Sequence, residues 1–82
     1  MKTGKKSQPK PEDVLKKIGL RLKEVRKAKG FKNYEHIAYE LGMSRSQYWK
    51  YEAGGNIEMK TLLRILTLID MPIKEFFEGL ES

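Results

Sequence analysis

The sequence predicts an all-α fold of five helices in a single domain. Apolar residues recur at spacings of three and four in five successive segments, as they do on the buried face of a helix. No segment alternates apolar and polar residues over the length of a strand, and glycine, proline, asparagine or serine marks the boundaries. The chain has 82 residues, which fits one domain on the usual scale of roughly 100 to 200 residues.

We expect a flexible basic arm in residues 1–10 and a folded domain in residues 11–82. The opening MKTGKKSQPK has four lysines and no apolar periodicity. The first helix begins at Pro11, because proline suits the first helical position, and Gly30 ends it. Its apolar stripe consists of Leu15, Ile18, Leu22 and Val25.

Two short helices follow. Asn33 is a good N-cap for the second helix, and Gly42 ends it. The buried face of this helix consists of Ile37, Ala38 and Leu41. Ser44 and Gln47 fit the S-x-x-Q capping box, so the third helix starts at Ser44, and we expect it to run to about Glu52.

The last two helices are the most apolar. After the turn AGGN at residues 53–56, the segment 57–69 predicts a fourth helix with apolar positions at Leu62, Leu63, Leu66 and Ile69. Pro72 opens a short fifth helix at its first position, and Gly79 ends it. The core face of this helix consists of Ile73, Phe76 and Phe77.

The charge distribution favours a polyanion as partner. The net charge is +6, and residues 1–34 carry 12 basic and 3 acidic side chains, whereas residues 35–82 carry 5 and 8. Cysteine is absent, and no apolar run is long enough for a signal-peptide core or a membrane span. We therefore expect a cytoplasmic protein with no membrane association.

The second and third helices fit a helix-turn-helix, in which two short helices are joined by a tight turn and the second enters the major groove of DNA. With Tyr34 taken as the first position of this unit, apolar or aromatic residues stand where side chains must pack between the two helices. They are Ile37, Leu41, Met43, Tyr48 and Tyr51. Ala38 falls at the closest helix approach and Gly42 in the turn, where a left-handed backbone favours glycine.

From Ile18 to about Phe77 the sequence resembles the Cro/C1-type (Xre-like) helix-turn-helix family of phage and bacterial transcriptional regulators. The segments that carry the resemblance are IGLRLKEVRKAKG, NYEHIAYELGMSRSQYWKYEAG and LLRILTLIDMPIKEFF. The resemblance implies a five-helix, lambda-repressor-like DNA-binding domain, commonly a homodimer on an inverted repeat. We expect a sequence-specific regulator, a repressor, that reads double-stranded DNA with its third helix.

The resemblance also implies which residues contact DNA. The base-reading positions are Arg45, Ser46 and Lys50, and Arg45 can donate two hydrogen bonds to guanine O6 and N7. Residues expected at phosphate or beside the site are Asn33, Tyr34, Ser44, Gln47, Trp49, Gly55 and Asn56. Tyr34 stands where the family often has glutamine. Trp49 either packs on a sugar or a thymine methyl or covers neighbouring side chains, and the basic arm either lies along DNA or serves as a solubilising tail.

Arg26 and Glu52 stand where the family places a structural ion pair between the end of the first helix and the end of the third. If the pair is buried, loss of one partner costs about 3 kcal/mol or more. If it is exposed, the pair contributes only ~0 to 1 kcal/mol.

An enzyme is not expected. The single histidine, His36, has no partners at metal-ligand spacing, and there is no nucleophile motif or phosphate-binding loop. We therefore predict no catalytic residue, no metal site and no cofactor. The alternative is an antitoxin or protein-interaction module on the same fold, in which Phe77 and Leu80 form a dimer seam, a toxin contact or only intramolecular core.

Overall fold

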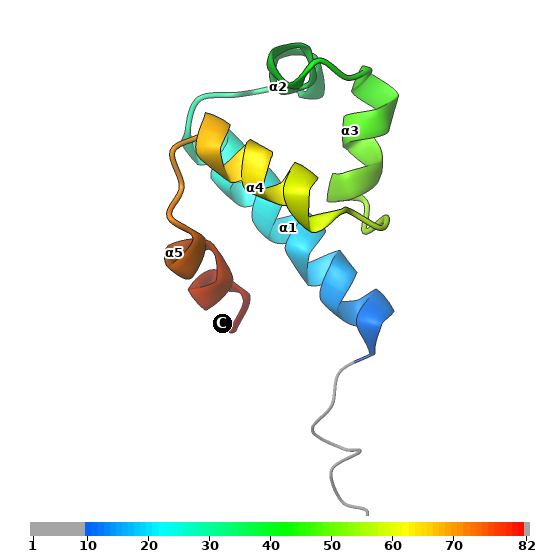
Figure 1. Cartoon of the computed structure of the whole chain (residues 1–82), viewed down its shortest axis with the longest axis vertical. Helices are drawn as coiled ribbons and strands as arrows, with labels where there is room; N and C mark the ends of the chain where they lie inside the picture. Colours follow the sequence, from blue (N-terminus) through cyan, green and yellow to red (C-terminus); the bar gives the residue numbers. More distant parts are fainter. Residues whose placement is uncertain (1–9, 82) are drawn as a thin grey trace, which may run out of the picture.

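The structure is a computed structural model that describes residues 10–81 (Figure 1), so the first nine residues of the predicted basic arm lie outside it. The described residues contain no strand, and their helices are α1 (Pro11–Ala28), α2 (Tyr34–Leu41), α3 (Arg45–Glu52), α4 (Met59–Leu68), α5 (Ile73–Glu78) and the 3₁₀ helix η2 (Gly79–Glu81). The prediction of an all-α fold with five α-helices is therefore confirmed. Within residues 10–81, no helix combines the length and the apolar character needed to cross a membrane.

Local capping sets where α2 and α3 begin and how they are joined. The Asn33 side chain accepts a hydrogen bond from the His36 amide at 3.0 Å, and Ser44 Oγ accepts one from the Gln47 amide at 3.1 Å. Between the two helices, Gly42 has a left-handed backbone with φ of 72°, which a side chain would disfavour. The sequence predicted each of these three features.

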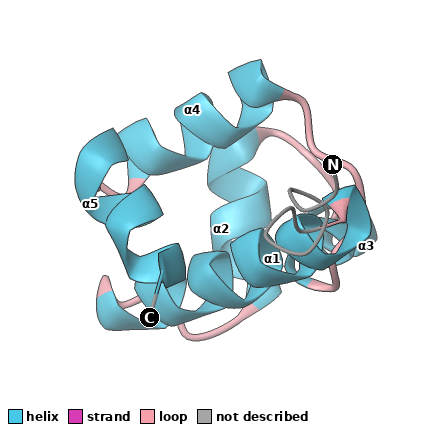
Figure 2. Ribbon diagram, turned by 90° about the horizontal axis from the view of Figure 1, so that it is seen from below, coloured by secondary structure: helices cyan, strands magenta, loops and turns pink. Residues whose placement is uncertain are grey.

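A single core lies among the five helices (Figure 2). Its buried hydrophobic residues are Leu22, Val25, Ile37, Ala38, Leu41, Tyr48, Leu62, Ile65, Leu66, Ile69 and Phe76. Tyr48 is the one fully buried hydrophobic side chain that α3 contributes, while Tyr34, Met43 and Tyr51 pack against the core from its margin. Because α3 is anchored mainly through one face, most of its other side chains remain exposed.

The backbones of α1 and the end of α3 approach closely at Gly19. A Cβ atom added at Gly19 would lie 2.5 Å from the carbonyl oxygen of Glu52 and 2.7 Å from that of Tyr51. Only glycine allows this separation, because the groups that a side chain would meet are backbone atoms and cannot swing aside. The sequence analysis did not single out Gly19.

The structure corrects three details of α4 and α5 and bears out a fourth. Pro72 is the N-cap of α5 and lies one residue before the helix, rather than at its first position. Ile73 is 53% exposed and Leu63 36% exposed, so neither belongs to the buried core. Gly79 ends α5 as predicted, as its C-cap, although with φ of −67° it is not left-handed, and the short 3₁₀ helix η2 follows.

The side chain of Arg21 in α1 contacts the end of α5 beside Gly79. Its guanidinium donates hydrogen bonds to the carbonyl oxygens of Phe76 at 3.0 Å and Glu75 at 2.9 Å. A Cβ atom at Gly79 would overlap this guanidinium. The glycine therefore makes room for a side chain of α1, which is a tertiary requirement that the sequence pattern does not reveal.

Candidate functional site

Four of the predicted site residues line one shallow pocket between the start of α2 and the first turns of α3. The pocket has a volume of about 420 Å³, and its lining residues are Tyr34, Arg45, Ser46 and Trp49. Trp49 borders this pocket and is 49% exposed, so about half of its surface is open to solvent. The neighbouring side chains of Gln47 and Lys50 are also exposed. The site is therefore a polar and aromatic surface on α3 rather than an enclosed cleft.

Arg45 has a neighbour that the sequence analysis missed. Its Nη1 atom lies 3.8 Å from Oε2 of Glu35 in α2, and the two side chains are 63% and 71% exposed. An exposed pair of this kind adds little stability. Nothing in the residue spacing indicated this contact, because it depends on how α2 and α3 cross.

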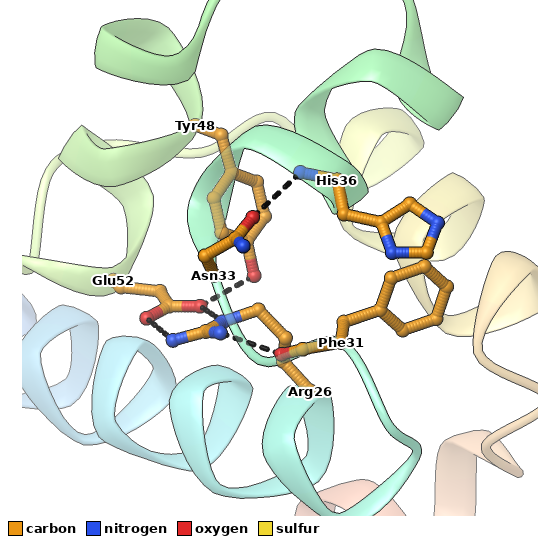
Figure 3. Close-up of polar contacts among 6 residues, drawn as sticks. All are labelled: Arg26, Phe31, Asn33, His36, Tyr48 and Glu52. Carbon is orange, nitrogen blue, oxygen red and sulfur yellow. Dashed lines mark hydrogen bonds and ion pairs between the residues drawn. The ribbon is translucent and has the colours of Figure 1, made fainter.

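Beneath the pocket lies a buried polar cluster, formed by Arg26, Glu52, Tyr48 and the Phe31 carbonyl (Figure 3). Arg26 Nε lies 2.6 Å from Glu52 Oε2, and Nη2 lies 3.2 Å from Oε1, so the pair is bidentate. The two side chains are only 2% and 3% exposed. The ion pair expected between these residues is present, and it is buried.

Two further hydrogen bonds, from Arg26 and Tyr48, engage the remaining polar groups of this cluster. Arg26 Nη1 donates to the Phe31 carbonyl at 2.6 Å, and the Tyr48 hydroxyl donates to Glu52 Oε2 at 2.6 Å. Throughout the described residues, no buried side-chain nitrogen or oxygen lacks a hydrogen-bond partner. The cluster therefore carries little of the desolvation cost that an unpaired buried charge would impose.

The protonation states follow from burial and from the carboxylate. Burial, reinforced by the hydrogen bond to Glu52, raises the pKa of Tyr48 well above its usual range, because ionisation would place a second negative charge beside the carboxylate. Burial by itself would lower the pKa of Arg26, but the hydrogen bond and charge of Glu52 raise it above its ordinary value. Both groups keep their protons at neutral pH.

This cluster also supports the wall of the pocket. The guanidinium carbon of Arg26 lies 4.9 Å from the centre of the Tyr34 ring, and the Tyr34 and Tyr48 ring centres are 6.3 Å apart. Tyr34 is therefore held from the inside by a buried cation and a buried ring. Its position does not depend on a ligand.

The remaining predicted contacts are distributed around the site. Asn33 and Ser44 use their side chains as caps. The Gly55 amide donates to the Lys50 carbonyl at 2.7 Å, so the backbone donor expected there for phosphate is engaged within the protein. Asn56 is exposed in the same turn, while Gly54, with φ of 100°, lies against Lys16 of α1.

The two residues named as dimer contacts are only partly accessible. Phe77 packs against the core, with its ring perpendicular to that of Phe76 at 5.2 Å. Leu80 is also half-buried and lines a hollow of about 340 Å³ beside Leu20, which is 65% exposed. Phe77 is thus mainly intramolecular core, and Leu80 retains a face toward solvent.

No metal centre is formed by the part of the chain that the structure describes, since no three His, Cys, Asp or Glu side chains converge there. The His36 ring instead packs against Phe31 at a tilt of 54°, with ring centres 4.7 Å apart. In comparisons with known proteins, no family model matches the sequence and no curated protein matches it.

Proposed function

We propose that the protein is a sequence-specific DNA-binding regulator of transcription, a repressor of the Cro/C1-type family with the lambda-repressor-like fold. In this proposal α2 and α3 form the helix-turn-helix, and α3 lies in the major groove. The observation that carries it is the exposed face of α3, where Arg45, Ser46 and Trp49 border one pocket together with Tyr34, whose ring contacts the buried Arg26. Base recognition needs such groups on a rigid support, because a misplaced donor loses its hydrogen bond.

Each residue has a defined task in this proposal. Arg45 donates two hydrogen bonds to guanine, Ser46 donates to or accepts from a neighbouring base, and Lys50 contacts guanine or the backbone. The Tyr34 hydroxyl and Gln47 contact phosphate, which positions the domain without specifying sequence. A homodimer then places two copies of α3 about one helical turn apart on an inverted repeat.

The test is selection from a randomised duplex pool by the purified full chain at about 0.15 M salt, close to physiological ionic strength. We expect enrichment of an inverted repeat with half-sites one helical turn apart. Arg45→Ala should relax the preference at one position per half-site, at a cost of about 1 to 3 kcal/mol. Lys74→Ala, in α5, is the matched control and should leave the preferred sequence unchanged. An unchanged sequence in the Arg45 variant, or retention without enrichment, contradicts the proposal.

A second candidate is an antitoxin or another protein-interaction module. It is favoured by two adjoining hollows of about 490 and 480 Å³, which share Leu63 and Thr67 on α4, away from α3. Their apolar side chains include Leu63 and the exposed Ile73. If the DNA pool yields no enriched sequence, this candidate becomes the leading one, and a stable complex with a co-encoded protein would establish it.

A further inference from the structure

We infer that Glu35 is a specificity-determining residue, whose carboxylate disfavours binding of Arg45 to phosphate and so reserves this arginine for guanine. The inference rests on the proposed DNA-binding function and gives a task to a residue of α2 that the predicted DNA contacts did not include. It concerns how the protein distinguishes its operator from other DNA, rather than which base it reads.

The first observation is the distance between the two charges. Glu35 Oε2 lies 3.8 Å from Arg45 Nη1, which is close enough for electrostatic attraction but longer than a hydrogen bond. Within residues 10–81, no hydrogen bond engages the guanidinium of Arg45. The carboxylate therefore offsets the charge of Arg45 and leaves its N–H donors available for a ligand.

The second observation is that both side chains are open to solvent, at 63% exposure for Arg45 and 71% for Glu35. A phosphate oxygen bonded to Nη1 of Arg45 in this position would lie at most about 7 Å from Glu35 Oε2. This separation is within the screening length of about 8 Å at physiological ionic strength, so the two anions repel each other. If Arg45 swings away to reach the phosphate, it loses the attraction of Glu35 instead.

Guanine does not meet this penalty. Its O6 and N7 atoms are neutral acceptors, and Arg45 can bond both of them with the carboxylate still beside it. Contacts to base edges carry sequence information, whereas contacts to phosphate do not. A carboxylate next to the arginine therefore weakens binding to DNA of any sequence more than binding to the operator.

The composition of α2 supports this task for Glu35. The helix has the sequence YEHIAYEL, in which Glu35 and Glu40 are both exposed and there is no lysine or arginine. Its start is nevertheless expected at phosphate, through Asn33 and Tyr34. An acidic residue in the first turn also stabilises a helix through its dipole. That contribution does not depend on Arg45, so it can be separated by experiment.

The experiment measures the affinity of the full chain for the selected operator and for a scrambled duplex of the same composition, over a range of salt concentrations. Glu35→Gln removes the charge and keeps the shape of the side chain. We expect affinity for the scrambled duplex to rise about 3- to 6-fold, the size of one contact between charges about 4 Å apart in water. Its slope of log affinity against log salt concentration should steepen by about 1. Affinity for the operator should rise less, so the ratio of the two affinities falls.

Two variants serve as controls. Glu40→Gln removes the same charge from the same helix, at an exposed position that lines a hollow beside α4 instead of the pocket at Arg45. It should leave the ratio of operator to scrambled affinity unchanged. Glu35→Asp keeps the charge and should keep a ratio close to that of the wild type. Thermal unfolding of each variant verifies folding.

A double-mutant cycle with Arg45→Ala tests whether Glu35 acts through the arginine. In the Arg45→Ala background no guanidinium remains to be reserved for guanine. Addition of Glu35→Gln should then change the affinity for the scrambled duplex no more than Glu40→Gln does. The salt slope should also stay that of Arg45→Ala alone.

The outcomes separate this inference from the proposed function. An enriched operator whose affinity ratio is the same for the wild type and Glu35→Gln overturns the role of Glu35 and leaves DNA recognition intact. A fall in the ratio that persists at full size in the Arg45→Ala background also overturns it, because the carboxylate would then repel DNA without acting on the arginine. Failure to enrich any sequence removes the proposed function itself, and this inference with it.

Discussion

Arg26 connects several elements of this fold. Its guanidinium contacts the Glu52 carboxylate, the Phe31 carbonyl and the Tyr34 ring, so it links α1 to α3, to the loop before α2 and to α2 itself. Buried charges of this kind are costly when one partner is lost, because the other remains desolvated and unpaired.

The first prediction concerns this pair. Arg26→Ala should lower the free energy of unfolding by about 3 to 5 kcal/mol, because it strands the Glu52 carboxylate in the core. Urea denaturation at neutral pH measures the change. Lys23→Ala, at an exposed position on the same helix, is the control and should change stability by less than about 0.5 kcal/mol. A loss below about 1 kcal/mol for Arg26→Ala would contradict the buried role.

The second prediction concerns the pH dependence that Tyr48 imposes. Its folded-state pKa is raised above the ordinary value of about 10. Its stabilising contribution is therefore complete below pH ~10 and is lost above it, where the unfolded chain releases the proton and the folded chain does not. Above that pH, the wild-type chain should lose up to about 1.4 kcal/mol per pH unit more than Tyr48→Phe.

Unfolding free energies between about pH 8 and 11, spanning the ordinary tyrosine pKa, give the comparison. Tyr39→Phe removes a tyrosine that is 81% exposed, and it should follow the wild-type curve. Parallel curves for the wild type and Tyr48→Phe would show that Tyr48 ionises as easily in the folded state as in the unfolded one.

For single residues, the sequence predicts an interaction correctly where both partners stand at positions that a known family pattern pairs. Arg26 and Glu52 were paired because their places in the chain match the family pattern. The Tyr48 hydroxyl was missed as part of the pair, although Tyr48 and Glu52 are one helical turn apart in α3, a spacing at which side chains meet. The Glu35 contact to Arg45 had no such signal.

At the scale of helices, the accuracy of the prediction follows the range of the interactions that set each boundary. The starts of α2 and α3 depend on side chains that cap a backbone amide three residues away, so the local sequence suffices. The end of α5 depends on Arg21, which bonds carbonyls more than fifty residues distant in the chain. The proline rule therefore placed the start of α5 one residue early, whereas Gly79 does end α5 and only the Arg21 contact at that end went unpredicted.

The third prediction tests the contact between α1 and α3. Alanine is the better helix former by about 1 kcal/mol, yet Gly19→Ala should destabilise the protein by a net of about 1 to 3 kcal/mol, because its Cβ would press on the Glu52 carbonyl. Under the proposed function it should also weaken DNA binding by displacing α3. Chemical denaturation and DNA titration measure the two effects.

Lys17→Ala is the matched control for that substitution, since Lys17 is exposed on α1 two residues away. Its stability should remain within about 0.5 kcal/mol of the wild type. A Gly19→Ala protein more stable than wild type would mean that α1 and α3 separate at little cost.

At the scale of the whole molecule, the positive charge is concentrated in the first 34 residues of the chain. Residues 1–34 have a net charge of +9 and residues 35–82 a net charge of −3. Lys16 of α1 lies against Gly54, in the turn that follows α3, so part of the basic helix adjoins the proposed interface. This arrangement suits a polyanion that spans both elements.

The fourth prediction uses salt to count phosphate contacts. Lys16→Gln should reduce the slope of log affinity against log salt concentration by about 1 and weaken binding alike on all sequences. Lys74→Gln, in α5, should leave the slope unchanged. Equal slopes for the wild type and the Lys16 variant would remove α1 from the phosphate contacts.

The links that Arg26 makes have a consequence for motion. If α3 separated from the rest of the domain, the bonds between Arg26 and Glu52 would break. Tyr34 would then lose its contact with a fixed Arg26, which would loosen α2 at the same time. The two helices should therefore open as one unit, and their central backbone amides should exchange hydrogen for deuterium at a common rate set by global unfolding. A domain built this way meets its ligand as a preformed surface, and any adaptation on contact must come from the ligand.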